Sequence, residues 1–332
     1  MVITQTPLRI SFLGGGTDYP EYFRQHGGAT LASAINKYST VTVHPLTQFV
    51  EYTLRVHYSQ LESVDALDRI EHSGARECLR FCGVESGFEV YYAADLPART
   101  GLGSSSSAVV GLLHALHTMK GEGLSAAELA EEAIHIERDV IQDRVGSQDQ
   151  YICALGGFRH LQFSPDGSVR ATALDISSAR LASLEERLLL LYTGRQRTAH
   201  EVLEEQIERT KTGQNNEILS GMKDLVGQGI EILTGTDDLS EFGQLLHEGW
   251  ELKRQLSSKV STEWIDHHYL EARRAGAVGG KILGAGSGGF LLLFVEPHDR
   301  ARVKQALADL PEAPFSFEQK GTRVILNNSR PA

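Results

Sequence analysis

The sequence has few cysteines, no long apolar run and no excess of basic residues. The odd number of cysteines, Cys78, Cys82 and Cys153, favours free thiols in a reducing compartment and gives no closed zinc site. There is no run of about 18 apolar residues and no basic segment before an apolar core at the N-terminus, so we expect a cytoplasmic protein without a membrane span or signal peptide. The formal net charge of −11 argues against nucleic-acid binding. Small phosphorylated ligands remain possible, because they need only a local nest of donors.

The rest of the composition is typical of a globular protein. The 332 residues are 41% hydrophobic and 23% charged, which suits one large domain or two medium ones. LRISF (8–12) alternates apolar and polar residues and predicts a strand that ends at three glycines. RLLLLYTG (187–194) predicts a buried strand, and long helical patterns follow it. Because strands and helices mix in both halves, we predict an α+β fold with two domains, residues 1–185 and 186–332.

A glycine- and serine-rich segment, PARTGLGSSSSA (97–108), lies between a predicted strand and a predicted helix. This arrangement binds anions, because the first amides of a helix lack partners and the helix dipole adds positive charge. Gly101 and Gly103 would let the backbone approach a phosphate, and serine hydroxyls can donate to phosphate oxygens or ligate magnesium. No lysine follows as in a Walker A loop. The alternative is a helix cap with a flexible loop, for which one serine would suffice.

A second glycine-rich segment is KILGAGSGGFLLLFV (281–295). Gly284, Gly286 and Gly289 match the dinucleotide fingerprint by letter, but that motif must follow a strand and open a helix. An apolar strand follows here instead. We therefore predict a tight turn between strands with its backbone exposed beside a ligand, and a plain hairpin is the alternative.

Glu137 is predicted to lie on an apolar helix face. The helical pattern over 129–141 places it beside Ile134. A carboxylate in that position needs a partner, because burying it alone is costly. The spacing leaves two partners equally open: a magnesium ion, or a salt bridge at the rim with Arg138 or Arg144.

Asp149 is predicted to lie in the first turn of a short helix. In GSQDQ (146–150), Ser147 and Gln150 have the spacing of a capping box. The helix dipole favours an ionised carboxylate at that position, and such a group can serve as a general base. The alternative is an acidic residue that only complements the dipole.

Three of these segments occur in an order and spacing that resemble the GHMP kinases, named for galactokinase, homoserine kinase, mevalonate kinase and phosphomevalonate kinase. They are PLRISFLGGGTDYP (7–20), PARTGLGSSSSA (97–108) and KILGAGSGGF (281–290). The resemblance spans nearly the whole chain. It implies an N-terminal ATP-binding domain like the second domain of ribosomal protein S5 and a ferredoxin-like C-terminal domain. It also implies transfer of the γ-phosphoryl group of ATP to a hydroxyl, with Mg²⁺.

The resemblance implies roles for individual residues. Asp149 matches the family's catalytic aspartate, and Arg9 matches the basic residue beside it, which would steady the developing oxyanion. Ser105 and Glu137 match the magnesium ligands. The residues expected to bind ATP are Pro97, Gly101, Leu102, Gly103, Ser104, Ser105 and Ser106. Ser104 and Ser106 would donate to the phosphates, and Ser107 is the least committed of the four serines.

The acceptor is expected to lie against two segments, formed by Gly16, Thr17, Asp18 and Tyr19 and by Gly284, Gly286 and Ser287. Asp18 matches the acid that holds sugar hydroxyls in galactokinase-like members, although it also has capping-box spacing with Glu21. The chain departs from the family pattern in two places. Gly14-Gly15-Gly16 stands where many sugar and mevalonate members have Gly-Glu-His, and Ser287 stands where glycine is more usual.

Within the family, the motifs look most like the branch that contains D-glycero-D-manno-heptose 7-phosphate kinase. That likeness implies phosphorylation of the anomeric hydroxyl of a heptose phosphate, giving a 1,7-bisphosphate for nucleotide-activated heptose synthesis. An L-fucokinase- or galactokinase-like sugar 1-kinase is the first alternative, and a catalytically inactive sugar and ATP sensor is the second. A kinase for mevalonate or homoserine also stays open. A phosphorylated acceptor needs a second basic pocket, for which Arg195, Arg197 and His200 are candidates.

Overall fold

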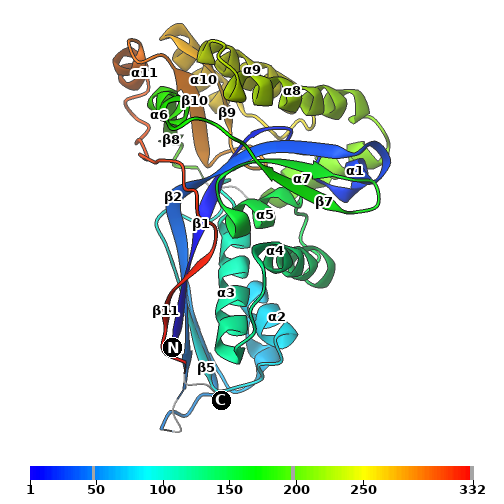
Figure 1. Cartoon of the computed structure of the whole chain (residues 1–332), viewed down its shortest axis with the longest axis vertical. Coiled ribbons are helices and arrows are strands. Elements are labelled where there is room, and N and C mark those ends of the chain that lie inside the picture. The colour runs from blue at the N-terminus through cyan, green and yellow to red at the C-terminus, as the bar shows by residue number, and fades with distance from the viewer. Residues whose placement is uncertain (47–48, 196–198, 330–332) are drawn as a thin grey trace.

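The computed structural model describes residues 1–46, 49–195 and 199–329, and within them the strands form two sheets (Figure 1). The larger sheet has the order β11–β1–β2–β5–β3–β4, and β6 and β7 extend it from β2. The smaller has the antiparallel order β8–β10–β9. With helices on both, the predicted α+β class is confirmed. The bounds in the larger sheet are β1 (Val2–Leu13), β2 (Gly28–Pro45), β3 (Leu54–His57), β4 (Leu61–Val64), β5 (Phe88–Ala94), β6 (Phe158–Phe163), β7 (Val169–Ala173) and β11 (Arg323–Asn327).

The long pair β1–β2 connects the two ends of the molecule (Figure 1). In β1, Leu8, Ile10 and Phe12 are buried in the hydrophobic core, while Arg9 and Ser11 point to the opposite face. This is the alternation predicted for LRISF. The strand ends at Gly14, whose φ of +78° turns the chain away from the sheet.

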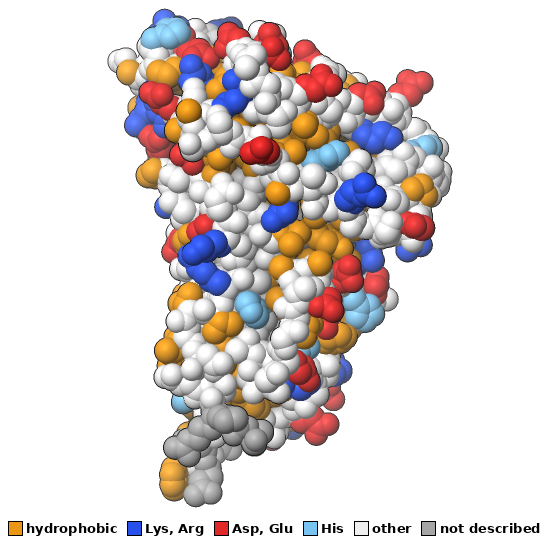
Figure 2. All heavy atoms as spheres, in the orientation of Figure 1, with side chains coloured by type: hydrophobic (Ala, Val, Ile, Leu, Met, Phe, Trp, Pro, Cys, Tyr) orange, Lys and Arg blue, Asp and Glu red, His pale blue; other side chains and the backbone are white. Residues whose placement is uncertain are grey.

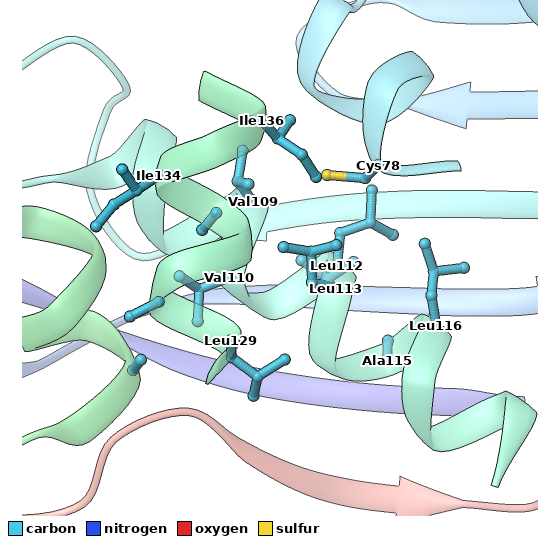
Figure 3. Close-up of a cluster of buried hydrophobic side chains, with 14 of the residues drawn as sticks. Cys78, Val109, Val110, Leu112, Leu113, Ala115, Leu116, Leu129, Ile134 and Ile136 are labelled. Atoms are coloured by element: carbon cyan, nitrogen blue, oxygen red, sulfur yellow. The ribbon is translucent and has the colours of Figure 1, made fainter. Parts of the chain in front are cut away.

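Helix α3 (Ser104–Lys120) packs on β1 and β2 and forms the centre of one hydrophobic core. Its apolar residues meet α2 (Ser73–Phe81), α4 (Ala126–Ile134) and the π-helical turn His135–Val140 (Figure 3). Leu113 of α3 is fully buried there. Cys78, Cys82 and Cys153 are all buried free thiols. The remaining short elements on this side are the 3₁₀ turn Leu67–Arg69 and α5 (Gln148–Leu155).

The smaller sheet is made of apolar strands and is covered by helices. Its strands are β8 (Leu188–Tyr192), β9 (Ala277–Ile282) and β10 (Phe290–Val295), and β10 is buried along its whole length. Helices α9 and α10 pack against β9. The helices of this half are α6 (Ser178–Arg187), α7 (Ala199–Lys211), α8 (Asn216–Thr234), α9 (Leu239–Lys253), α10 (Glu263–Arg274) and α11 (Arg300–Ala306).

The two sheets share apolar contacts. One hydrophobic cluster contains Ile10 and Phe12 of β1 together with Leu190 of β8 and Leu292 of β10. Phe12 also meets Phe242 of α9, which packs on the smaller sheet. Past the smaller sheet, the chain returns to the larger one, where β11 pairs with β1 (Figure 1). The division into domains of residues 1–185 and 186–332 stays a prediction. One strand does not follow it: β11 belongs to the second segment but pairs with β1 of the first.

Acidic and basic side chains are interspersed over the face shown in Figure 2. Acidic groups border the upper edge, where α8 and α9 lie. Among the described residues, no helix combines the length and apolar character that crossing a membrane requires.

The buried core around α3 gives a test of the fold. We expect Leu113→Ala to lower the free energy of unfolding by ~2–5 kcal/mol, because the removed atoms leave a cavity in a fully buried site. Denaturant unfolding measures this loss. Leu270→Ala is the matched control, since Leu270 also lies on a helix but is 53% exposed. Equal losses in the two variants would contradict the placement of Leu113.

Candidate active site

The two glycine-rich segments touch each other backbone to backbone. Gly101 has a φ of +83°, and a side chain on it would place Cβ 2.5 Å from the carbonyl oxygen of Leu283. Conversely, a Cβ on Gly284 would lie 2.5 Å from Cα of Gly101. Glycine is therefore required at both positions by close approach and by the left-handed backbone. The second and third motifs of the sequence meet here, although 183 positions separate Gly101 from Gly284 (284 − 101).

Helix α3 begins directly after this contact. Gly103, in the left-handed region, is its N-cap, and no side chain caps the first turn. Ser104 is half-buried and Ser105 exposed, so both hydroxyls are accessible at the helix start. Ser107 is fully buried and donates to the carbonyl oxygen of Thr6, which gives it a structural role. The open first turn is the arrangement that binds anions.

Glu137 lies in the π-helical turn after α4 and is 1% exposed. Its Oε2 accepts a hydrogen bond of 2.6 Å from Nε2 of Gln150, while its Oε1 has no partner. Burial raises the pKa of this carboxyl to about 7, although Gln150 and the nearby hydroxyls of Ser106 and Ser105 lower it. The alternative of a salt bridge at the rim is wrong, because Arg138 pairs with Asp139 and Arg144 with Glu204.

Two acceptor oxygens on this hydrogen-bonded pair of side chains are buried and have no hydrogen-bond partner: Oε1 of Glu137 and Oε1 of Gln150. Unpaired buried acceptors are costly, and a hard cation with oxygen ligands would satisfy them. Among the described residues, no group of three or more His, Cys, Asp or Glu side chains is placed to hold a metal. A site with one carboxylate, a serine hydroxyl and phosphate oxygens is the kind that Mg²⁺ prefers.

Arg9 and Asp149 form a bidentate ion pair. Nε and Nη2 of Arg9 donate to the two carboxylate oxygens over 2.7 and 2.6 Å. Burial opposes the charge of the guanidinium, but Asp149 outweighs it and raises the pKa of Arg9. The Asp149 side chain is 25% exposed while that of Arg9 is 5% exposed, so the carboxylate faces outward from a buried support.

Arg9 also holds the glycine–serine loop. Its Nη1 donates to the carbonyl oxygen of Gly101 over 2.6 Å, and its backbone amide donates to that of Leu102. Asp149 lies in the first turn of α5, as predicted. The predicted capping box is wrong, because the Ser147 side chain makes no cap hydrogen bond to the helix.

Asp18 is fully enclosed next to this pair. It accepts hydrogen bonds from the amides of Gly16 and Gln148, at 3.0 and 3.3 Å. Burial and the charge of Asp149 raise the pKa of the Asp18 carboxyl, although both amides lower it. The alternative role as a helix cap is wrong, since the N-cap of α1 (Pro20–His26) is Tyr19 and no side chain caps that helix.

The remaining predicted site residues fall into three groups. Thr17 and Ser287 are buried, and their hydroxyls donate to backbone carbonyls of Gly14 and Ala29 and of Lys259, respectively. Ser287 has a φ of +64°, which explains why glycine suits that position. Gly16, Gly284 and Gly286 also have left-handed φ values. Of the others, Leu102 is buried, Tyr19 is half-buried beside Asp18, and Pro97 is exposed. Arg197 lies outside the described residues, as does the side chain of His200.

Two buried lysines lie near Arg9, and the motifs assigned no individual role to either of them. Lys281 of β9 donates to the carbonyl oxygen of Phe12, and Lys253 of α9 donates to those of Ile282 and Gly284. Burial, with the nearby charge of Arg9, lowers the pKa of Lys281 to about 7, and that of Lys253 is held well below its usual value. The helical spacing of Lys253 from buried Trp250 was a signal for its burial.

Comparison with known proteins assigns the family. The model described as the GHMP kinases N-terminal domain matches residues 65–157, and the one described as GHMP kinases C-terminal matches residues 231–313. The chain belongs to the GHMP kinase family and is an ATP-dependent phosphotransferase, as the motifs predicted.

Individual relatives extend over nearly the full chain. The chain is 29% identical to a D-glycero-alpha-D-manno-heptose 7-phosphate kinase of Campylobacter jejuni, over 96% of this chain and 97% of the relative. A crystal structure of a D-glycero-D-manno-heptose 1-phosphate kinase from Bacteriodes thetaiotaomicron superposes with a TM-score of 0.80 at 26% identity, covering 99% of this chain and 100% of that one. Galactokinase of Lactococcus lactis, with a TM-score of 0.73 at 18% identity over 97% of this chain and 94% of its own, shares the fold.

The lowered pKa of Lys281 predicts a pH-dependent stability difference. Between about pH 7 and the ordinary lysine value near 10.4, the unfolded chain binds more protons than the folded one. We therefore expect the free energy of unfolding of the unmodified protein to rise, relative to Lys281→Met, as the pH increases across this window. Urea unfolding at several pH values measures the difference. Lys320→Met, at an exposed position, is the control, and a gap for Lys281→Met that stays constant with pH would contradict the prediction.

Proposed function

We propose that this protein is a sugar kinase that uses ATP and Mg²⁺ to phosphorylate the anomeric hydroxyl of a heptose phosphate. The observation that carries the proposal is the ion pair of Arg9 in β1 and Asp149 in α5, which lies beside the first turn of α3. A Cβ on Gly103 would lie only 3.3 Å from Oδ2 of Asp149, so the carboxylate adjoins the anion-binding turn. A proton acceptor thus lies beside the expected position of the transferred phosphoryl group.

The donor phosphates are assigned to the first turn of α3. Phosphoryl transfer depends mainly on positioning and on stabilising charge. The free amides of α3, its dipole and the accessible hydroxyls of Ser104 and Ser105 supply donors for the phosphates. We assign this function to the proposed ATP-binding domain, residues 1–185, and the loop from Gly284 to Ser287 in the proposed domain 186–332 would border the same phosphates.

Glu137 and Ser105 would hold the magnesium ion. The unpaired Oε1 atom of Glu137 and the position of the Ser105 hydroxyl beside that carboxylate support the assignment. When bound, Mg²⁺ neutralises charge on the phosphates during transfer. The Gln150 amide keeps the Glu137 carboxylate oriented through its bond to Oε2.

Asp149 is assigned as the general base and Arg9 as its support. Each carboxylate oxygen of Asp149 uses one lone pair for Arg9, which leaves the other free to accept a proton from the acceptor hydroxyl. The Arg9 charge would then stabilise the oxyanion that develops. An anomeric hydroxyl is more acidic than an ordinary sugar alcohol, which eases this step. Asp18, beside Asp149, would hold further hydroxyls.

The substrate class rests on the relatives. Two of them are named as kinases of a D-glycero-D-manno-heptose phosphate, and their names place the phosphate differently, at position 7 and at position 1. A heptose that carries a phosphate is what they share. Arg195, which stacks over Trp264, with Arg197 and His200 would bind that second phosphate. A protein of Bacteroides fragilis named L-fucokinase/L-fucose-1-P guanylyltransferase is 25% identical over 96% of this chain and 38% of its own length, which keeps a fucose acceptor as the second candidate.

Removing the proposed base tests the mechanism. We expect Asp149→Asn to lower kcat by ~10²-fold or more, because an amide cannot take up the proton. Steady-state kinetics with saturating Mg·ATP measure the loss, and a nucleotide-binding assay shows whether the site remains folded. Asp166→Asn, in the exposed β6–β7 turn, is the matched control. Near-normal turnover of Asp149→Asn would remove Asp149 from this role.

A panel of acceptors tests the substrate. We expect phosphoryl transfer to D-glycero-D-manno-heptose 7-phosphate with a kcat/KM well above those for fucose, galactose and mannose, because only the first offers a phosphate to a second basic pocket. Coupled ADP release measures the rates. Turnover of an unphosphorylated hexose alone would refute the heptose phosphate while leaving the kinase. Tight ATP binding without turnover of any sugar would instead support an inactive sensor.

A further inference from the structure

Two buried polar side chains beside the proposed base have atoms without partners. Ser11 of β1 is 6% exposed, and its Oγ makes no hydrogen bond. Gln148 of α5 is 8% exposed, and its Oε1 likewise has no partner. A buried polar atom left unpaired costs free energy, and native proteins keep few of them. Because both unpaired atoms lie in the same region, a single ligand could form the missing hydrogen bonds.

Both side chains converge on Gly15. A Cβ built on Gly15 would lie 3.4 Å from Oγ of Ser11 and 3.6 Å from Nε2 of Gln148, and apart from its chain neighbours no third atom of the described residues comes within 4 Å. The backbone does not require glycine at this position, because Gly15, unlike Gly14 and Gly16, lies outside the left-handed region. Gly15 therefore contributes space between two polar groups rather than backbone freedom.

The surface formed by Ser11, Gly15 and Gln148 adjoins the residues that we propose bind the acceptor. Ser11 follows Arg9 by two positions on the same face of β1. Gln148 precedes Asp149, and its backbone N–H donates to Oδ2 of Asp18. The space in front of Gly15 is thus bordered by elements that also position the proposed base and Asp18.

The hydrogen-bonding groups of Ser11 and Gln148 favour a ligand that carries hydroxyl groups. The Ser11 hydroxyl can donate and accept, and the Gln148 amide offers one donor group and one acceptor. A sugar hydroxyl also donates and accepts, so it can complete both side chains at once. An anionic group fits less well, because Oε1 of Gln148 and the carboxylate of Asp18 are acceptors.

We propose that Ser11 and Gln148 bind a non-reacting hydroxyl of the sugar, and that the missing side chain at Gly15 gives that part of the acceptor its room. This inference rests on the proposed sugar kinase function and adds specificity-determining residues to it. It requires no particular sugar, so it applies to whichever acceptor the protein phosphorylates.

Gly15→Ala is the sharpest test, because it adds one methyl group between the two polar side chains without straining the backbone. We expect the KM for the acceptor to rise at least about 10-fold while the KM for ATP changes less than about 2-fold, since the methyl occupies acceptor space and not donor space. Gly227→Ala is the matched control, as a Cβ there meets nothing within 4 Å. Thermal unfolding checks that both variants fold.

Ser11→Ala provides an independent measurement. Loss of one hydrogen bond between neutral groups should raise the acceptor KM about 5- to 10-fold, again with little change for ATP. An unchanged acceptor KM in both variants would overturn the inference. So would a parallel rise in the KM for ATP, which would indicate a general structural role. If the unmodified protein phosphorylates another sugar, only the heptose assignment fails and the same comparison is made with that sugar. If it phosphorylates no sugar, the proposed function and this inference fail together.

Discussion

The candidate site depends on the bidentate contact between Arg9 and Asp149. Arg9 is buried in β1, yet through its guanidinium and backbone amide it reaches Asp149, Gly101 and Leu102. One residue thereby joins a strand, the first turn of α5 and the loop before α3, which come from three distant parts of the chain. Replacing it with lysine would not preserve this connection, because only a guanidinium presents several donors in a fixed plane. The geometry of donor loop and proposed base is therefore coupled through Arg9.

The second constraint is the absence of side chains where the two glycine-rich segments meet. Gly101 and Gly284 approach so closely that neither position has room for a Cβ. On the Gly284 side of this contact, Lys253 donates to the carbonyl oxygens of Ile282 and Gly284. On the Gly101 side, Arg9 donates to the carbonyl oxygen of Gly101. The smaller sheet thus contributes to the site through its backbone, which is held by two buried basic side chains. The segment 281–295 can therefore border the site through its backbone, although it does not open a helix as the dinucleotide-binding motif does.

Local patterns predicted much of the fold and part of the site. The alternation in β1 identified the core face and left Arg9 opposite it, and helical spacing identified buried Glu137. The motifs together identified the family. The capping boxes at Asp18 and Ser147 failed, because tertiary hydrogen bonds of Asp18 with Gln148 compete with local caps. The unpaired atoms of Ser11 and Gln148 had no sequence signal, since they follow from how β1 and α5 meet.

The buried acidic and basic side chains around the site lie on different parts of the structure. Glu137 belongs to the turn after α4, whereas Lys253 and Lys281 belong to the helix and strand of the smaller sheet, and neither lysine has a carboxylate partner among the described salt bridges. Burial shifts the pKa of the Glu137 carboxyl and of the Lys281 ammonium toward neutrality, so each charge is poorly compensated without a ligand. A divalent cation at the unpaired Oε1 would compensate the Glu137 carboxylate, and the proposed donor, a magnesium complex of a triphosphate, supplies that cation. The two lysines instead donate to backbone carbonyl oxygens, so their role is to hold the backbone of β1 and of the loop after β9 in place.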